Sequence, residues 1–272
     1  MGAQTDSSAA AAATTRLVSS SAGEGLELLT ITSPDLRNRW SHAASADLAS
    51  AADRLEKTPA IRVLVITGAG DEYFSAGSFD PALRRSSPKE QTVQFVLSNA
   101  RLRDRLGQLP QITIAALNGQ AVGSGVELSL ACDLRLISDK AGIRFPEIDM
   151  GGFPGGGGTA RLPEVIGRAA ALDLICTGRA VHADELLRLG FCQRVFPAAT
   201  FMQDVLAYAT LIASKAGHAL RGAKEITWAR TRPGFAEARL LSDQRRAELE
   251  WHPDTDEAIQ AAIEGRKPIF RS

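Results

Sequence analysis

The chain has 272 residues, of which 44% are hydrophobic, and it carries 31 basic and 31 acidic side chains. This length is enough to bury one sizeable core, and the hydrophobic fraction is ordinary for a globular enzyme. Because the formal net charge is zero, no overall field draws the protein to nucleic acid or to an anionic membrane. We therefore expect no nucleic-acid partner and no membrane partner, and an anionic ligand would need a local basic cluster.

The cysteines and the N-terminal segment indicate the cellular compartment in which the protein is expected. Cys132, Cys176 and Cys192 show neither CxxC spacing nor histidines arranged as metal partners, so we expect buried reduced thiols and no metal site. No apolar run reaches the roughly 18 to 20 residues that a membrane span needs. Residues 1–21 are rich in Ala, Ser and Thr and lack the basic and apolar regions of a secretory signal. We predict a disordered tail there and a cytoplasmic protein.

Strand and helix patterns alternate through the first part of the chain. The segment 61–67, Ile-Arg-Val-Leu-Val-Ile-Thr, is a nearly continuous apolar run, which is typical of a strand buried on both faces. Repeated β-α units of this kind favour a layered α/β fold. We expect strands at 26–32, 61–67, 112–117 and 134–137, helices at 43–57, 90–109 and 126–131, and a polar loop at 84–88.

From residue 159 onward the patterns are mainly helical. A helical layer is therefore expected to follow an α/β core, and we find no internal repeat and no linker that would separate independent domains. The helices are expected at 160–166, 169–176, 183–189, 201–215 and 235–249.

Two glutamates stand out because glycine-rich segments surround them. Glu127 ends the segment Gly-Gln-Ala-Val-Gly-Ser-Gly-Val-Glu, and Glu147 precedes the segment Ile-Asp-Met-Gly-Gly-Phe-Pro-Gly-Gly-Gly-Gly. Paired carboxylates beside exposed backbone amides indicate proton transfer on a carbonyl compound. The residues alone also allow ordinary roles, since Glu127 in a first helical turn would stabilise the helix dipole and Glu147 is compatible with a solvated loop.

The glycine clusters have two further interpretations. Gly155 to Gly158 would suit a phosphate at a helix start, but no Lys-Ser or Lys-Thr follows as in a P-loop. We prefer a structural turn that positions Glu147. Gly68-Ala-Gly70 follows a predicted strand, yet the third glycine of a dinucleotide-binding fingerprint is absent from its expected place.

Several ordered motifs together resemble one family. They include Phe74-Ser-Ala-Gly77, the segment 115–133 (Ala-Ala-Leu-Asn-Gly-Gln-Ala-Val-Gly-Ser-Gly-Val-Glu-Leu-Ser-Leu-Ala-Cys-Asp), Phe145-Pro-Glu147 and the segment 154–162 (Pro-Gly-Gly-Gly-Gly-Thr-Ala-Arg-Leu). These motifs resemble the enoyl-CoA hydratase/isomerase family, also called the crotonase superfamily. The resemblance extends over about residues 26–270.

The resemblance implies an α/β fold with a crotonase-like spiral core of ββα turns at 22–198 and a C-terminal helical trimerisation region at 199–272. It implies a homotrimer or hexamer that acts on acyl-CoA thioesters and needs no metal or redox cofactor. In the family, two backbone N–H groups stabilise a thioester enolate. On this sequence they map to Ser78, directly after Ala76-Gly77, and to Ser124, three positions before Glu127.

In the hydratase branch of the family, two glutamates hold a water against the β-carbon and exchange its proton with the α-carbon. The resemblance therefore implies that Glu127 positions the water as a base and that Glu147 protonates the α-carbon. The expected reaction is hydration of a trans-2-enoyl-CoA to a 3-hydroxyacyl-CoA, as in fatty acid metabolism. The alternatives are an enoyl-CoA isomerase or another crotonase-type reaction on a bulkier acyl-CoA, and a non-catalytic CoA-binding scaffold.

Residues expected to contact the substrate or its CoA moiety follow from the same resemblance. Three departures from the family pattern bear on the acyl pocket: Ser78-Phe79-Asp80 replaces Ala-Asp-Leu, Ser124 replaces a glycine, and Arg39-Trp40 replaces a small aliphatic pair, placing an aromatic near the ligand entrance. Surface ion pairing remains an alternative for Arg37 and Lys267. The expected contacts are Arg37, Ala76, Gly77, Phe79, Asp80, Gly123, Lys267 and Phe270.

Overall fold

The computed structural model describes residues 14–33, 37–79, 81–251, 253–266 and 268, and its strands form two sheets. All neighbouring strands in the larger sheet are parallel except β1 and β2, which form an antiparallel hairpin. The larger sheet has the order β1 (Arg16–Gly23), β2 (Leu26–Thr32), β3 (Val63–Gly68), β5 (Ile112–Leu117), β7 (Leu134–Ser138) and β10 (Arg194–Phe196). The smaller sheet has the order β4 (Tyr73–Ser75), β6 (Gln120–Val122), β8 (Gly142–Arg144) and β9 (Val181–His182).

The two sheets arise from a repeated path of the chain. After β3, β5 and β7 in the larger sheet, the chain enters β4, β6 and β8 in the smaller one, and helices follow before the next long strand. Each repeat is a ββα unit, and successive units stack side by side through parallel pairing in both sheets. This is the ββα spiral that the family resemblance implies.

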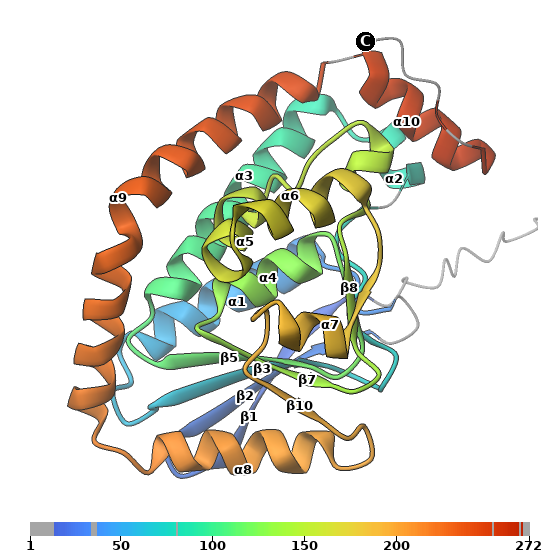
Figure 1. Cartoon of the computed structure of the whole chain (residues 1–272). Coiled ribbons are helices and arrows are strands. Elements are labelled where there is room, and N and C mark those ends of the chain that lie inside the picture. The colour runs from blue at the N-terminus through green and yellow to red at the C-terminus, as the bar shows by residue number, and fades with distance from the viewer. Residues whose placement is uncertain (1–13, 34–36, 80, 252, 267, 269–272) are drawn as a thin grey trace, which may run out of the picture.

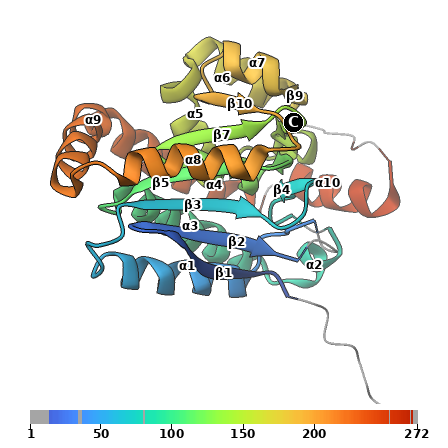
Figure 2. The same ribbon diagram turned by 90° about the horizontal axis from the view of Figure 1, so that it is seen from below.

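The strand β3 is buried on both faces, as its apolar run predicts. Val63 and Val65 belong to a core under α8 (Phe201–Ala213), to which the helix contributes Phe201, Val205 and other buried side chains. Leu64 and Ile66 point to the opposite core, because successive side chains of a strand alternate between faces. Figure 2 shows α8 crossing the strands of the larger sheet on this outer face.

The remaining helices cover the other face and one side of the sheet (Figure 1). Helix α1 starts at an N-cap, where the Ser41 side chain accepts a hydrogen bond from the Ala44 amide at 3.0 Å. These helices are α1 (His42–Leu55), α2 (Pro81–Ser86), α3 (Lys89–Gln108), α4 (Ser124–Ala131), the 3₁₀ helix η2 (Pro146–Met150), α5 (Gly158–Ile166), α6 (Arg168–Thr177) and α7 (Ala183–Arg188).

Two C-terminal helices, α9 (Gly217–Leu249) and α10 (Pro253–Glu264), lie on the outside of this assembly. Polar contacts attach α9 to Gln111 and Asp133, the residues directly before β5 and β7. Lys224 Nζ lies 2.7 Å from Asp133 Oδ2 and donates a hydrogen bond to the Gln111 carbonyl at 2.8 Å. Asp133 Oδ1 also accepts a hydrogen bond from Trp228 Nε1 at 2.9 Å.

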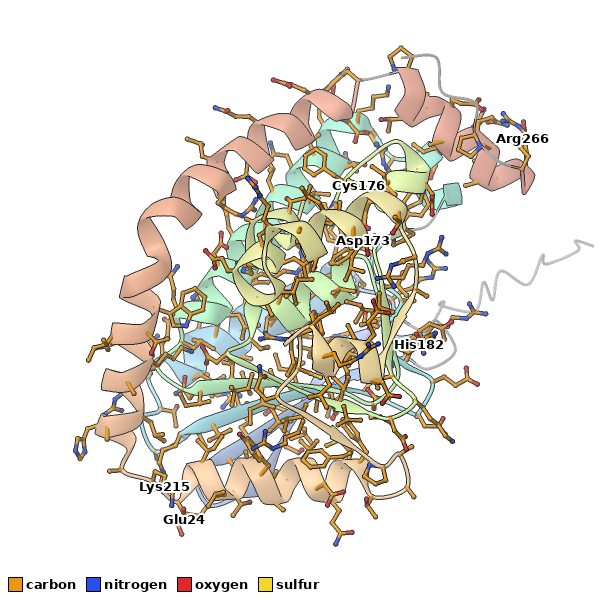
Figure 3. All side chains as sticks on the ribbon, viewed as in Figure 1. Glu24, Asp173, Cys176, His182, Lys215 and Arg266 are labelled. Atoms are coloured by element: carbon orange, nitrogen blue, oxygen red, sulfur yellow. The ribbon has the colours of Figure 1, made fainter. Side chains whose placement is uncertain are left out.

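We expect Lys224→Met to lower the free energy of unfolding by about 3 kcal/mol, because it leaves the largely buried Asp133 carboxylate without its counter-charge. The change is measured as a fall in Tm by calorimetry. Lys215→Met is the matched control, because this lysine is exposed at the turn between α8 and α9 (Figure 3). Equal Tm values for both variants would contradict an anchoring role for Lys224.

The structure corrects three expectations. The disordered tail predicted at 1–21 is too long, because 16–21 belong to β1 and pair with β2. This edge strand has mostly exposed polar side chains and therefore lacks the apolar signal of a buried strand. Part of the polar loop predicted at 84–88 belongs to α2, and the helix predicted at 235–249 begins at Gly217.

Residues 1–13 of the predicted tail lie outside the described residues. The boundary between the α/β core at 22–198 and the helical region at 199–272 stays a prediction. In the part of the chain that the structure describes, no helix combines the length and apolar character of a membrane span.

Candidate functional site

A cavity of about 570 Å³ lies where α3, α4, η2 and the loop after β4 meet. Its wall contains both predicted carboxylates, Glu127 and Glu147, and both predicted oxyanion residues, Ser78 and Ser124. Residues far apart in the sequence therefore meet at one concave site, the arrangement expected for a small-molecule pocket.

The segments that carry the two predicted oxyanion amides lie against each other. Gly77 has a φ of +78°, and a Cβ added there would lie 2.5 Å from the Val122 carbonyl oxygen and 3.3 Å from the Ser124 nitrogen. Ser124 is the first residue of α4, where helix N–H groups have no intrahelical acceptor and the helix end carries partial positive charge. The turn therefore offers N–H groups for an oxygen that gains negative charge.

Glu147 lies on η2 and is half-buried. Its carboxylate lies against the turn before α4, because a Cβ added to Gly123 would be 2.5 Å from Glu147 Oε1. The backbone of this glutamate is also fixed, since its carbonyl accepts a hydrogen bond from the Gly152 amide at 2.8 Å. Glu147 is thus placed next to Ser124, whose amide is one of the predicted oxyanion donors.

Glu127 is 3% exposed and lies on α4. Its Oε1 accepts hydrogen bonds from the Gly156 amide at 2.6 Å and from the Gly158 amide at 3.0 Å. A Cβ on Gly156 would lie 2.3 Å from Glu127 Oε2, so only glycine lets the backbone approach this closely.

This contact corrects the role predicted for the glycine run 155–158. Its amides hold the side chain of Glu127, whereas we expected the run to position Glu147. The sequence could not distinguish the two because both glutamates precede the run, and only the folded path shows which carboxylate reaches the amides.

Arg103 is a residue of the site that the sequence interpretation did not identify. It is 3% exposed, lies on α3 and lines the cavity. Its Nη1 is 3.8 Å from Glu127 Oε2, and its Nη2 donates to the Ser124 carbonyl at 3.3 Å. Burial lowers the pKa of the Arg103 guanidinium, and the charge of Glu127 opposes that effect. The available signal was its helical spacing from Ala100 and Leu106, which puts an arginine on the apolar face.

Aromatic side chains form another part of the wall. Trp40, Phe95 and Phe153 line the cavity. Trp40 is 4% exposed, and its Nε1 donates to Asn99 Oδ1 at 2.7 Å, which fixes the indole ring. The aromatic side chain predicted near the ligand entrance is therefore a buried part of the wall.

The structure places the predicted substrate contacts in three groups. Ala76, Gly77, Phe79 and Gly123 line the cavity. Arg37 does not line it: the side chain is exposed, and its guanidinium carbon lies 5.4 Å from the centre of the Tyr73 ring. Its role as a contact to the substrate or its CoA moiety stays a prediction. Asp80, Lys267 and Phe270 lie outside the described residues.

The cysteines lie outside the cavity wall. Burial raises the pKa of Cys132 to about 12 and that of Cys192 to about 11, so both remain neutral thiols at physiological pH. Cys176 is exposed on α6 (Figure 3), so the prediction of a buried thiol is wrong at this position. The helix buries Ala171, Leu174 and Ile175, and residue 176 lies on its solvent-facing side. Among the residues described, no three His, Cys, Asp or Glu side chains are grouped to hold a metal ion.

Comparison with known proteins identifies the family of this chain. The family model described as enoyl-CoA hydratase/isomerase matches residues 21–272. The putative enoyl-CoA hydratase/isomerase YngF of Bacillus subtilis (strain 168) is 32% identical over 248 residues, covering 91% of this chain and 95% of that protein. The (E)-benzylidenesuccinyl-CoA hydratase of Thauera aromatica is 32% identical over 248 residues, covering 89% and 94% of the two chains.

Solved structures show the same fold. The crystal structure of an enoyl-CoA hydratase from Mycobacterium avium subsp. paratuberculosis K-10 superposes with a TM-score of 0.83 at 26% identity. The match covers 94% of this chain and 98% of that chain.

Proposed function

This chain belongs to the enoyl-CoA hydratase/isomerase family, and we propose that within it the protein is a hydratase that adds water to a trans-2-enoyl-CoA. The product is the corresponding 3-hydroxyacyl-CoA. The observation that carries the proposal is that both carboxylates, Glu127 and Glu147, line one cavity together with the turn that presents the Ser124 amide.

The proposed addition begins with the thioester carbonyl oxygen between the amides of Ser78 and Ser124. As water adds to the β-carbon, negative charge collects on this oxygen, and fixed N–H donors stabilise it without reorganising solvent. The crowding around Gly77 supports this role, because it keeps the backbone of residues 76–78 against the start of α4.

The two carboxylates divide the proton transfer in this proposal. Glu127 accepts a proton from the attacking water, and its fixed Oε1 supports this role because the side chain cannot turn away. Glu147 enters this step protonated and delivers its proton to the α-carbon of the enolate. Transfer of the proton that Glu127 took from the water back to Glu147 then restores the pair. Its position beside the Ser124 turn supports this role, because the enolate oxygen would be held at the same turn. The proposed reaction uses no metal or redox cofactor.

We propose that the acyl groups accepted include ones bulkier than crotonyl. Trp40, Phe95 and Phe153 support this, since they give the cavity an aromatic wall. The Thauera aromatica relative also supports it, because that protein is named a hydratase of an acyl-CoA with a benzylidene group.

The proposal is tested by the loss of enoyl-thioester absorbance when the purified protein meets crotonyl-CoA or an aryl-substituted enoyl-CoA in the presence of a chelator. We expect turnover of at least one substrate and a 3-hydroxyacyl-CoA product by mass spectrometry. A shifted double bond without gain of water would favour an isomerase. Binding of CoA esters without turnover of either substrate would favour a scaffold.

The homotrimer or hexamer implied by the family stays part of the proposal. Exposed apolar side chains on the C-terminal helices support an interface there: Ile226 is 74% exposed and Leu240 is 62% exposed, both on α9. Contacts between subunits would cover these side chains, which are otherwise left in water.

A further inference from the structure

Glu127 is held asymmetrically by its surroundings. One oxygen, Oε1, accepts two backbone hydrogen bonds from the glycine run. The other, Oε2, faces Arg103 Nη1 at 3.8 Å, too far for a direct hydrogen bond but close enough for a strong charge interaction in a buried site. Among the residues that the structure describes, no donor forms a hydrogen bond to Oε2. This oxygen therefore remains the acceptor for a water or substrate proton.

The backbone at Gly156 lies against both charged groups, Glu127 and Arg103. A Cβ built on Gly156 would lie 2.3 Å from Glu127 Oε2 and 2.5 Å from Arg103 Nη1, so the glycine lies against both groups. The side chains of the pair are only 3% and 4% exposed. A buried carboxylate without a partner takes up a proton, because burial disfavours its charged form. Arg103 supplies the opposing charge.

Arg103 is itself held by several contacts. Its Nη2 donates to the Ser124 carbonyl at 3.3 Å, and its guanidinium carbon lies 6.0 Å from the centre of the Trp40 ring. The charged groups that face Arg103 come from three other helices and its own: Glu127 on α4, Arg161 on α5, Arg239 on α9 and Asp104 on α3. Glu127 in turn faces Arg103 and Arg161.

The charged groups around the Arg103–Glu127 pair are Asp104, Arg161, Arg239 and Asp243, and they compensate one another. Asp104 forms ion pairs with Arg161 and with Arg239, the latter at 3.5 Å. Arg239 also lies 2.6 Å from Asp243. Because Asp104 and Asp243 balance Arg161 and Arg239, the charge of Arg103 is matched by Glu127.

We propose that Arg103 is a positioning residue for the reaction: its guanidinium pairs with the Glu127 carboxylate and directs the free oxygen, Oε2, to the reacting water, while the glycine amides hold the other oxygen. The kinetic part of this role rests on the proposed hydration. The charge pairing does not, because it is a property of the folded protein.

The pairing is tested by a thermal double-mutant cycle with Arg103→Met, Glu127→Gln and the double variant. Each single change leaves one buried charge unpaired, whereas the double change removes both charges. We expect the fall in Tm of the double variant to be smaller than the sum of the falls in the two single variants. Additive Tm losses would overturn the proposal whatever the activity of the enzyme.

The effect on catalysis is tested by kcat and KM for the enoyl-CoA that the wild-type protein hydrates. Without the guanidinium, Oε2 of Glu127 loses the charge that directs it to the reacting water. We expect Arg103→Met to lower kcat by about tenfold or more while KM changes much less. Arg103→Lys keeps the positive charge and is expected to retain most of the wild-type kcat.

Arg101→Met is the matched control, because Arg101 is exposed on the same helix. We expect it to leave the Tm, kcat and KM unchanged. An unchanged kcat in Arg103→Met, or equal losses of kcat in the Met and Lys variants, would overturn the proposal. If the cycle shows coupling but the wild-type protein hydrates no enoyl-CoA, the pairing is supported and the proposed reaction is wrong.

Discussion

Glu147→Gln is expected to reduce kcat for enoyl-CoA hydration by about 10²–10⁴-fold, the contribution of a positioned acid or base. An amide has nearly the same shape as the carboxyl group, so it retains the contact with the turn at Gly123, but it cannot deliver a proton to the α-carbon. The measurement is the rate of absorbance loss at saturating enoyl-CoA. Because binding contacts are retained, we expect KM to change much less than kcat.

Asp149→Asn provides the control for this variant. Asp149 lies on the same 3₁₀ helix as Glu147, and its carboxylate is exposed and paired with Arg144 at 2.7 Å. An exposed pair of this kind contributes little to stability, so we expect activity within about twofold of the wild-type protein. Full hydratase activity in Glu147→Gln would show that another group protonates the α-carbon.

Gly77→Ala is expected to produce the second large loss, about 10²–10³-fold in kcat, which is the usual effect of removing one oxyanion donor. Gly77 has a φ of +78°, and an added Cβ would lie 2.5 Å from the Val122 carbonyl oxygen. The backbone must therefore move, and the amide of Ser78 moves with it relative to Ser124. Single-turnover kinetics with the enoyl-CoA substrate measure the effect on the chemical step.

Gly190→Ala separates backbone strain from crowding. Gly190 has a φ of +76°, almost that of Gly77, but an added Cβ would meet no atom closer than the Val165 carbonyl oxygen at 3.9 Å. We expect a loss of stability from the left-handed backbone of about 1–3 kcal/mol, with kcat retained by the folded protein. Equal losses of kcat in both glycine variants would contradict the role assigned to the loop of residues 76–78.

The regular elements of the core could be predicted from local patterns. The continuous apolar run of β3 indicates burial on both faces, and the structure confirms it. The helix predicted at 43–57 is present as α1, and its apolar side chains at helical spacing, from Ala44 to Leu55, are buried. The motifs around Glu127 and Glu147 also identified the family. These features depend on residue types within a short stretch, so the sequence alone was sufficient.

Other features depend on contacts between distant segments. The strand β1 is held by its pairing with β2, and its exposed residues carry no local sign of a sheet. The glycine run 155–158 binds Glu127 because the fold brings its amides to that carboxylate. Arg103 has the helical spacing typical of a core position. Its role depends on its pairing with Glu127, which lies 24 residues further along the chain.

The sequence therefore determined the family, the ββα core and the residues that carry the proposed chemistry, because these follow from local patterns and motifs. The tertiary structure was needed to show which groups hold those residues in place. Hydrogen bonds and charge interactions act over a few ångströms in space, and residues 103, 127 and 156 become neighbours only when α3, α4 and the glycine run pack together.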